Sequence, residues 1–191
     1  MIGVVLAGGK SVRLGQDKTR IMHNGQSLLE RAVTLLGHYC SGVYVSCRHT
    51  TTVPPAISTI VDTTQRVGPL GGIITCLKKI NAPILVLACD LPFMQGYFLE
   101  KLIQARILRP KHCVLTTWQE LETGFIQTLV SIYEPAALPL LEQGLIQKKY
   151  KINALIPQAL RHILTYPASE NQAFFNVNRP QDLHLLQQDQ A

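Results

Sequence analysis

The sequence predicts an α/β protein: a single Rossmann-like domain with a mostly parallel central sheet and helices on both of its faces. Short apolar runs alternate with longer helical patterns along the chain, which is typical of β-α-β units. The run Ile84–Cys89 is apolar throughout, as expected of a central parallel strand covered on both faces. With 191 residues and 47% hydrophobic content, the chain can form one domain with a substantial core.

The first β-α unit has the clearest local signals. An apolar strand over Ile2–Ala7 leads through a glycine-rich turn to a helix near Leu28–Leu36. Ser27 and Glu30 fit the S-x-x-E capping box of a helix start, and Gly37 fits a helix end. We expect this helix to pack its apolar face on the sheet.

The remaining elements follow the same alternation. Pro69 begins a helix, because its missing N–H costs nothing at the first helical position. Strands are expected at Val43–Cys47, Ile57–Val61, Ile84–Cys89 and Cys113–Thr116, with an antiparallel element at Ile126–Tyr133. Further helices are expected near Tyr97–Leu108, Pro135–Gln143, Asn153–Leu160 and just after Pro180. The stretch Trp118–Gly124 carries two glutamates and a glycine, so we expect an exposed excursion there.

The charge pattern favours a small anionic ligand. The formal net charge is +6, but the 18 Lys and Arg residues are spread along the chain, and no aromatic stacking series accompanies them. The first residues begin a strand without a basic leader or an apolar span long enough for a membrane. We therefore expect a cytoplasmic protein that has neither nucleic acid nor membrane as a partner.

Cysteine and histidine patterns indicate no metal cluster. The cysteines are odd in number and widely spaced without a C-x-x-C pair, so neither a disulfide framework nor a zinc site is indicated. We expect small buried hydrophobic side chains at Cys40, Cys47, Cys76, Cys89 and Cys113. The six histidines are scattered, and we expect structural or exposed roles for them.

The turn after the first strand has the composition of a phosphate-binding loop. Gly8 and Gly9 let backbone N–H groups approach an anion without a Cβ in the way. Arg13 and Lys18 add positive charge, although the turn fits neither the P-loop nor the G-x-G-x-x-G pattern. A tight turn without a ligand is the alternative for the glycines, and an exposed charge pair is the alternative for the cations.

Asp90 is the candidate metal ligand. It follows directly on the apolar run Ile84–Cys89, where a charge is costly unless it is hydrated or paired. Ligands of open α/β sheets bind at the carboxyl ends of the strands, so Asp90 and the glycine-rich turn face one crevice. Mg²⁺ commonly takes one or two protein carboxylates together with substrate phosphates, which suits a lone aspartate.

These motifs together resemble a known family. Residues 6–18 resemble the L-A-G-G-x-S-x-R-M-G-x-D-K signature of nucleotidyltransferases that join a nucleoside monophosphate to a phosphorylated acceptor, with Leu14 in place of Met. Later motifs of that family follow in the same order at Gly68–Gly72, Cys89–Phe93, Gln127–Leu129 and Phe174–Leu183. Asn176-Val177-Asn178 and Cys89-Asp90-Leu91-Pro92 are similar to the MobA-like molybdenum cofactor guanylyltransferases rather than to the cytidylyl branch.

The resemblance implies an activity, a cofactor and partners. It implies Mg²⁺-dependent transfer of GMP from GTP to a molybdopterin-type cofactor, with pyrophosphate released, and molybdoenzymes or cofactor-biosynthesis proteins as further partners. A nucleotide-binding half would cover about residues 1–95 and an acceptor-binding half about residues 96–191.

The resemblance also assigns roles to individual residues. Catalytic roles fall on Arg13, Lys18 and Asp90, with Asp90 as the Mg²⁺ ligand; nucleotide contacts fall on Leu6, Ala7, Gly8, Gly9, Lys18, Ser46, Asp62, Gly68 and Asp90; acceptor contacts fall on Asn176 and Asn178. Turn formation is the alternative for Asp62, Asn176 and Asn178.

Three positions depart from the family pattern. Ser46 stands where the guanylyl branch often has Asn, and it offers a hydrogen bond of shorter reach. Thr128 replaces a usual Pro and removes a constraint on φ. Arg179 replaces a usual Thr and brings a cation next to the expected acceptor site.

Two other functions stay open at this stage. A related nucleotidyltransferase would use CTP or a sugar-phosphate acceptor with the same residues, because the base is selected by a few pocket hydrogen bonds. A cofactor-binding adaptor would have kept the fold without turnover, but the retention of Arg13, Lys18 and Asp90 argues against it.

Overall fold

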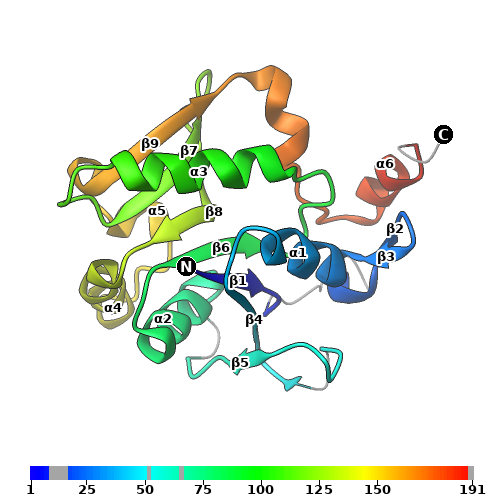
Figure 1. The fold of residues 1–191 in the computed structure, drawn as a ribbon, viewed down its shortest axis with the longest axis horizontal. Helices are drawn as coiled ribbons and strands as arrows, with labels where there is room; N and C mark the ends of the chain where they lie inside the picture. The colour runs from blue at the N-terminus through cyan, green and yellow to red at the C-terminus, as the bar shows by residue number, and fades with distance from the viewer. Residues whose placement is uncertain (9–16, 51–52, 65–66, 189–191) are drawn as a thin grey trace.

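The computed structural model describes residues 1–8, 17–50, 53–64 and 67–188. Within these residues, seven strands form one sheet in the order β5-β4-β1-β6-β8-β7-β9. Strands β5, β4, β1 and β6 run parallel, β8 is antiparallel to β6 and β7, and β9 is parallel to β7. The predicted class, a Rossmann-like α/β fold with a mostly parallel sheet, is confirmed (Figure 1).

The element bounds agree broadly with the sequence pattern. The strands are β1 (Ile2–Leu6), β2 (Met22–His23), β3 (Gln26–Ser27), β4 (Gly42–Cys47), β5 (Thr59–Val61), β6 (Ile84–Ala88), β7 (Leu115–Glu120), β8 (Ile126–Tyr133) and β9 (Arg161–Tyr166). The α-helices are α1 (Leu28–Gly37), α2 (Pro69–Ile80), α3 (Gly96–Leu108), α4 (Leu138–Ile146), α5 (Ile152–Leu155) and α6 (Leu183–Gln188). Short 3₁₀ turns are η1 (Lys18–Arg20), η3 (Pro135–Ala137), η4 (Gln158–Leu160), η5 (Ala168–Phe174) and η6 (Pro180–Asp182).

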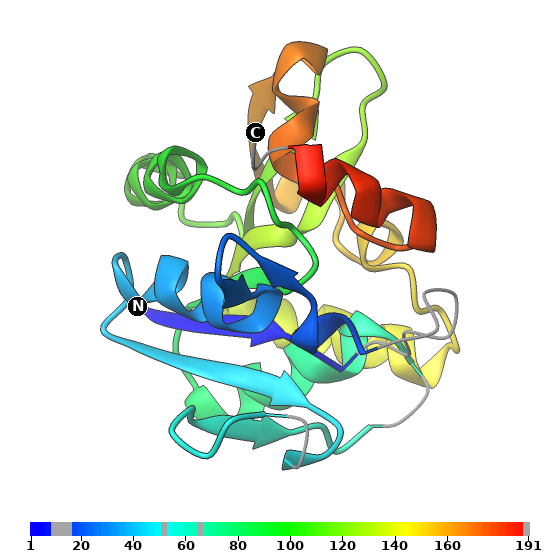
Figure 2. The ribbon, with the colours of Figure 1, turned by 90° about the vertical axis from the view of Figure 1, so that its right-hand side faces the viewer.

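Helices cover both faces of the sheet, which explains why β6 is apolar throughout. Leu85 and Leu87 pack in one core with residues of α1 and α3, whereas Ile84 and Val86 pack in a second core with residues of α2, α4 and α5. Figure 2 shows α3 (green) and α4 (yellow) on opposite sides of the molecule. Alternate side chains of a strand point to opposite faces, so a strand buried on both sides needs an unbroken apolar run.

Both predicted helix starts are confirmed. Ser27 caps α1, and its hydroxyl and the Glu30 carboxylate make the reciprocal capping-box bonds. Pro69 occupies the first turn of α2, and the preceding Gly68 has φ 66° and ψ −150°. A residue with a Cβ is strained in that conformation, so this turn requires glycine.

The expected excursion at Trp118–Gly124 was wrong for its first three residues. Strand β7 continues through Trp118 to Glu120, and only the stretch after it turns back towards β8. Trp118 is 4% exposed because its indole packs edge-on against Phe98 and Phe174, and its Nε1 donates to the Phe98 carbonyl. Aromatic packing thus outweighed the polar pattern of the neighbouring glutamates.

Two further differences lie in the second half of the chain. Residues Asn153–Leu160 do not form one helix: α5 ends at Leu155, and Pro157 separates it from η4. Strand β9 was not predicted; among the described strands it pairs with β7, at the end of the sheet order. Because an edge strand is half-exposed, its sequence mixes polar and apolar residues and gives a weak signal for a strand.

A small ribbon, β2–β3, precedes α1. Its turn residues Asn24 and Gly25 both have positive φ, at 49° and 76°. The Asn-Gly pair is a strong signal for such a two-residue turn. The ribbon was not predicted, although this pair indicates it. His23 at its end is buried, as expected of a structural histidine, and meets Phe93 edge-on.

The five cysteines are free thiols, and four of them are buried; Cys40 is half-buried. Burial raises the pKa of Cys76 and of Cys89 to about 12, which keeps both thiols protonated. In the described part of the chain, no helix has the length and apolar character needed to cross a membrane.

Candidate active site

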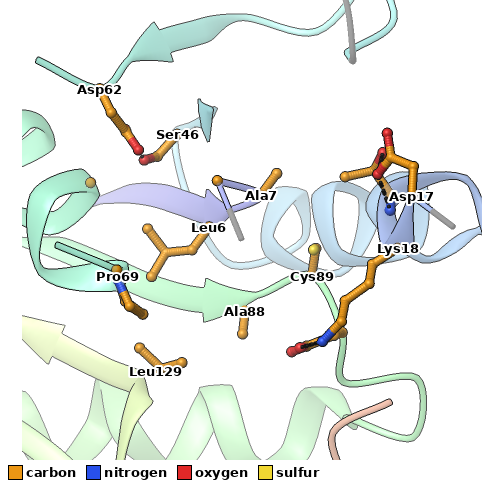
Figure 3. Close-up of a pocket in the computed structure, with 15 residues that line it drawn as sticks. Leu6, Ala7, Asp17, Lys18, Ser46, Asp62, Pro69, Ala88, Cys89 and Leu129 are labelled. Atoms are coloured by element: carbon orange, nitrogen blue, oxygen red, sulfur yellow. Dashed lines mark hydrogen bonds and ion pairs between the residues drawn. The ribbon is translucent and has the colours of Figure 1, made fainter. Parts of the chain in front are cut away.

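A pocket opens where the parallel strands end. Because β1, β4, β5 and β6 are parallel, their carboxyl ends lie on one edge of the sheet, where α/β proteins bind ligands. The residues that line the pocket are Leu6, Ala7, Gly8, Asp17, Lys18, Thr19, Ser46, Asp62, Gly68, Pro69, Gly72, Ala88, Cys89, Asp90 and Leu129 (Figure 3).

Sheet register builds the first end of the pocket. Leu6 of β1 pairs with Ser46 of β4, and Ser46 pairs with Ile60 of β5. Asp62 stands two residues beyond Ile60, on the same face, and the Ser46 Oγ donates to its Oδ1 at 2.6 Å. Ser46 and Asp62 point towards each other in Figure 3.

Glycines leave room around this pair. A Cβ on Gly8 would lie 2.9 Å from the Asp62 Oδ2. A Cβ on Gly72 of α2 would meet the Ser46 Oγ even more closely. The Gly8 and Gly72 backbones therefore approach the Ser46–Asp62 pair so closely that no other residue fits without a shift.

Burial disfavours the charged form of Asp62. Burial raises the pKa of its carboxyl above the usual range, while the Ser46 hydroxyl and the Arg48 cation oppose the rise. A half-buried carboxylate with one hydroxyl partner can still accept hydrogen bonds from a ligand.

An ion pair forms the second end of the pocket. The Lys18 Nζ lies 2.8 Å from the Asp90 Oδ2, and the two side chains are 16% and 18% exposed. Lys18 begins η1, which Asp17 caps: the Asp17 Oδ1 accepts from the backbone N–H of Thr19 and from its hydroxyl. The capped turn directs Lys18 across the pocket towards the end of β6 (Figure 3).

The donor set at Asp90 fits a divalent cation. Its second oxygen, Oδ1, is buried and has no hydrogen-bond partner among the described residues. An unpaired buried carboxylate oxygen is costly, and a hard cation would satisfy it. The described residues contain no cluster of three or more His, Cys, Asp or Glu side chains suited to a metal. Among the described residues that line the pocket, Asp17, Asp62 and Asp90 carry carboxylates, and of these only Asp90 has a buried oxygen without a hydrogen-bond partner.

The acceptor candidates lie at different distances from this ion pair. Asn178 joins it directly, because the Lys18 Nζ donates to the Asn178 Oδ1 at 2.6 Å. The neighbouring Val177 N–H donates to the Asp90 carbonyl at 3.0 Å. Asn176 is half-buried, and its carbonyl receives a long bond of 3.4 Å from the Asn178 amide.

The structure therefore gathers most of the residues singled out in the sequence. Leu6, Ala7, Gly8, Lys18, Ser46, Asp62, Gly68 and Asp90 all line the pocket, while Asn176 and Asn178 do not line it. Gly9 and Arg13 lie outside the described residues. Sequence reasoning named none of Asp17, Thr19, Pro69 or Leu129 as a site residue, although all four also line the pocket. Asp17 was recognisable, since it stands beside Lys18 in the signature stretch.

Fold and site together define a nucleotidyltransferase of the α/β class, and comparison with known proteins agrees. The model of the MobA-like NTP transferase domain matches residues 3–163. The chain therefore belongs to the MobA-like NTP transferase family, and it is a nucleotidyltransferase.

Relatives extend over the whole chain. A probable molybdenum cofactor guanylyltransferase of Halalkalibacterium halodurans is 30% identical over 95% of both chains. A molybdenum cofactor biosynthesis bifunctional protein of Synechocystis is 37% identical over 73% of this chain, a match that spans 41% of that longer protein. Molybdopterin-guanine dinucleotide biosynthesis protein A of Archaeoglobus fulgidus has the same fold, with a TM-score of 0.80 at 24% identity over 98% of this chain and 97% of that one.

Proposed function

We propose that this protein transfers GMP from GTP to a molybdopterin-type cofactor and releases pyrophosphate. The observation that carries the proposal is the Lys18–Asp90 pair beyond the end of β6, where one Asp90 oxygen has no hydrogen-bond partner among the described residues and both side chains line the pocket. The full-length similarity to a probable molybdenum cofactor guanylyltransferase supports GTP as donor and molybdopterin as acceptor.

The reaction requires two polyanions to approach each other. An oxygen of the acceptor phosphate attacks the α-phosphorus in line and forms a new P–O bond. The bond from the α-phosphorus to the bridging oxygen breaks, and pyrophosphate leaves with that oxygen and the electron pair. No side-chain nucleophile takes part, so the protein acts by positioning and by stabilising charge.

The residues divide this work between the two ends of the pocket. We assign the nucleotide to the backbone at Leu6–Gly8 and to Ser46, Asp62 and Gly68, which surround the first end. At the second end Lys18 supplies a half-buried positive charge for the phosphates. We assign the same role to Arg13, on the family resemblance.

Asp90 would hold Mg²⁺ through its unpartnered oxygen. When bound, the cation supplies Lewis-acid stabilisation of the negative charge that develops on the phosphates. Lys18 pairs with the other oxygen of Asp90, Oδ2, so the ion pair fixes the orientation of the carboxylate and leaves Oδ1 available to a cation.

We place the acceptor near Asn176 and Asn178, in the half of the chain from about residue 96 onwards. Asn178 is the link between this half and the phosphate end, since its Oδ1 contacts Lys18. We expect the protein to act in the cytoplasm, where GTP and Mg²⁺ are available, and to meet molybdoenzymes or cofactor-biosynthesis proteins there.

Pyrophosphate release tests the proposal. The purified protein is incubated with Mg²⁺, molybdopterin and each nucleoside triphosphate in turn. GTP should give the fastest release, and release should depend on the acceptor. Faster turnover with CTP would support a cytidylyltransferase instead. Binding of GTP without turnover would support a cofactor-binding adaptor.

A further inference from the structure

The C-terminal segment 176–186 does not line the pocket, but it contacts Lys18 at the phosphate end through Asn178. A small apolar core of Ile21, Leu28, Val177 and Leu186, with Phe93, Phe175 and Leu183 packed against it, joins three distant segments. Figure 1 draws α6 beside the β2–β3 ribbon, in agreement with these contacts. Each polar group has an apolar residue of this core close to it in the sequence. Ile21 lies three residues after Lys18, Phe93 lies three residues after Asp90, and Val177 directly precedes Asn178.

Within this segment, Asp182 fixes the backbone that carries Asn178. One oxygen of its carboxylate, Oδ2, accepts from the N–H of Asn178 at 2.8 Å and from the N–H of Arg179 at 2.7 Å. Pro180 begins η6 between them, so the turn is closed by a rigid residue and by two hydrogen bonds to a charge. Charge-assisted bonds of this kind are about twice as strong as neutral ones.

The contacts form one continuous chain from Asp182 to Asp90. The Asp182 carboxylate holds the Asn178 backbone, the Asn178 side chain accepts from Lys18, and Lys18 pairs with Asp90. Asp182 itself is half-buried and does not line the pocket. Among the described residues, its carboxylate therefore reaches the site through Asn178.

We infer that Asp182 is a positioning residue for the transfer reaction, one that holds Asn178 against Lys18 and so keeps the lysine aligned with Asp90. The effect on the transfer rate rests on the proposed function. The effect on the position of the Lys18 side chain does not, and it can be measured without substrate. Removal of the Asp182 carboxylate should release Asn178 and leave the Lys18 amine more accessible.

A double-mutant cycle tests this coupling without any substrate. The rate at which the Lys18 amine is acylated, followed by mass spectrometry, is measured for the parent, Asp182→Ala, Asn178→Ala and the double variant. Each single change should raise the rate about fivefold, the effect of one hydrogen bond of typical net strength. Because both act on the same contact, the double variant should be no faster than Asn178→Ala.

Kinetics supply the second readout. Asp182→Ala should lower kcat for GMP transfer and raise KM for the acceptor, each about as much as Asn178→Ala does. If the parent transfers no GMP at all, the proposed function fails, but the acylation cycle still decides whether Asp182 acts on Lys18.

Matched variants separate positioning from stability. Asp182→Asn keeps an acceptor oxygen of the same reach, so its acylation rate should lie between those of the parent and Asp182→Ala. This variant also serves if the alanine variant does not fold. Glu122→Ala removes an exposed carboxylate on the turn after β7 and should leave the rate unchanged. The inference would be overturned if the effects of Asp182→Ala and Asn178→Ala on the acylation rate were additive in the double variant. It would also be overturned if Asp182→Asn reacted at the parent's rate and Asp182→Ala lost only thermal stability.

Discussion

The two ends of the pocket are assembled in different ways. Ser46 and Asp62 meet because their strands are neighbours in register, and a single hydrogen bond links a neutral and a charged group. Lys18, Asp90 and Asn178 meet across 72 and 160 residues of sequence, and they are held by an ion pair, a polar contact and a separate apolar core. The first end is a consequence of the sheet, whereas the second depends on where the C-terminal segment packs.

This difference predicts where changes will matter. Changes at the second end should act mainly on the phosphates and on the rate, because charge develops there. Changes at the first end should act on nucleotide affinity and on stability, because a half-buried carboxylate lies against close-packed glycines.

The largest effect is expected from Asp90→Asn. The change preserves size but removes the charge that would hold the cation, so GMP transfer at saturating GTP should fall by about a thousandfold. The Mg²⁺ concentration needed for half-maximal rate should rise, and a thermal melt should show a folded protein. Glu100→Gln, an exposed carboxylate of α3, is the control. A folded Asp90→Asn protein with near-normal turnover would remove Asp90 from the metal site.

Lys18→Ala should come second. It removes a cation that is 16% exposed and faces the phosphates, so the affinity for GTP should fall about 10- to 100-fold while guanosine binds nearly as before. Calorimetry at low and high salt would show the loss shrinking as salt rises, to the extent that solvent screens the charge. Lys111→Ala changes an exposed lysine after α3 and should leave GTP affinity unaltered. Equal affinity in Lys18→Ala and the parent would exclude Lys18 from the residues that bind the GTP phosphates.

Gly8→Ala probes the first end by size alone. Its new Cβ would lie 2.9 Å from the Asp62 Oδ2, so the carboxylate must move and nucleotide affinity should fall about fivefold to tenfold. Gly37→Ala is the matched control, because a Cβ at Gly37 meets nothing within 4 Å. Unchanged nucleotide affinity in Gly8→Ala would show that Asp62 does not contact the nucleotide.

The smallest effect concerns stability and pH at Asp62. Because burial raises the pKa of this carboxyl in the folded state, the folded state binds its proton more tightly than the unfolded chain does. The stabilising contribution of the protonated group is present below the usual pKa and is lost as pH rises through the raised one. Asp62→Asn should therefore raise Tm at neutral pH, by about 2 °C for a domain of this size.

Melts across a pH series check the sign of this effect. The difference in Tm between Asp62→Asn and the parent should narrow as pH falls below the raised pKa, while nucleotide affinity at neutral pH decreases. A gap in Tm that widens towards acid pH would contradict the raised pKa.

Local signals in the sequence were sufficient for much of the fold. The capping box at Ser27 and Glu30, the proline that begins α2 and the apolar run of β6 each fix an element by short-range chemistry. The same signals gave Asp90 its place at the end of a central strand. Strand β9 and the continuation of β7 were missed, because an edge strand and a tryptophan shielded by distant aromatic rings carry no local period.

The sequence by itself determined most of the strands and helices as far as β8, the glycine-rich turn and the identity of the charged groups, since each follows from residue type and spacing. Only the tertiary structure decided that Asn178 contacts Lys18, that Asp182 holds Asn178, and that Gly8 and Gly72 lie against the Ser46–Asp62 pair. The physical reason is that these contacts depend on sheet register and on the packing of one small apolar core, which bring together side chains that no sequence interval relates.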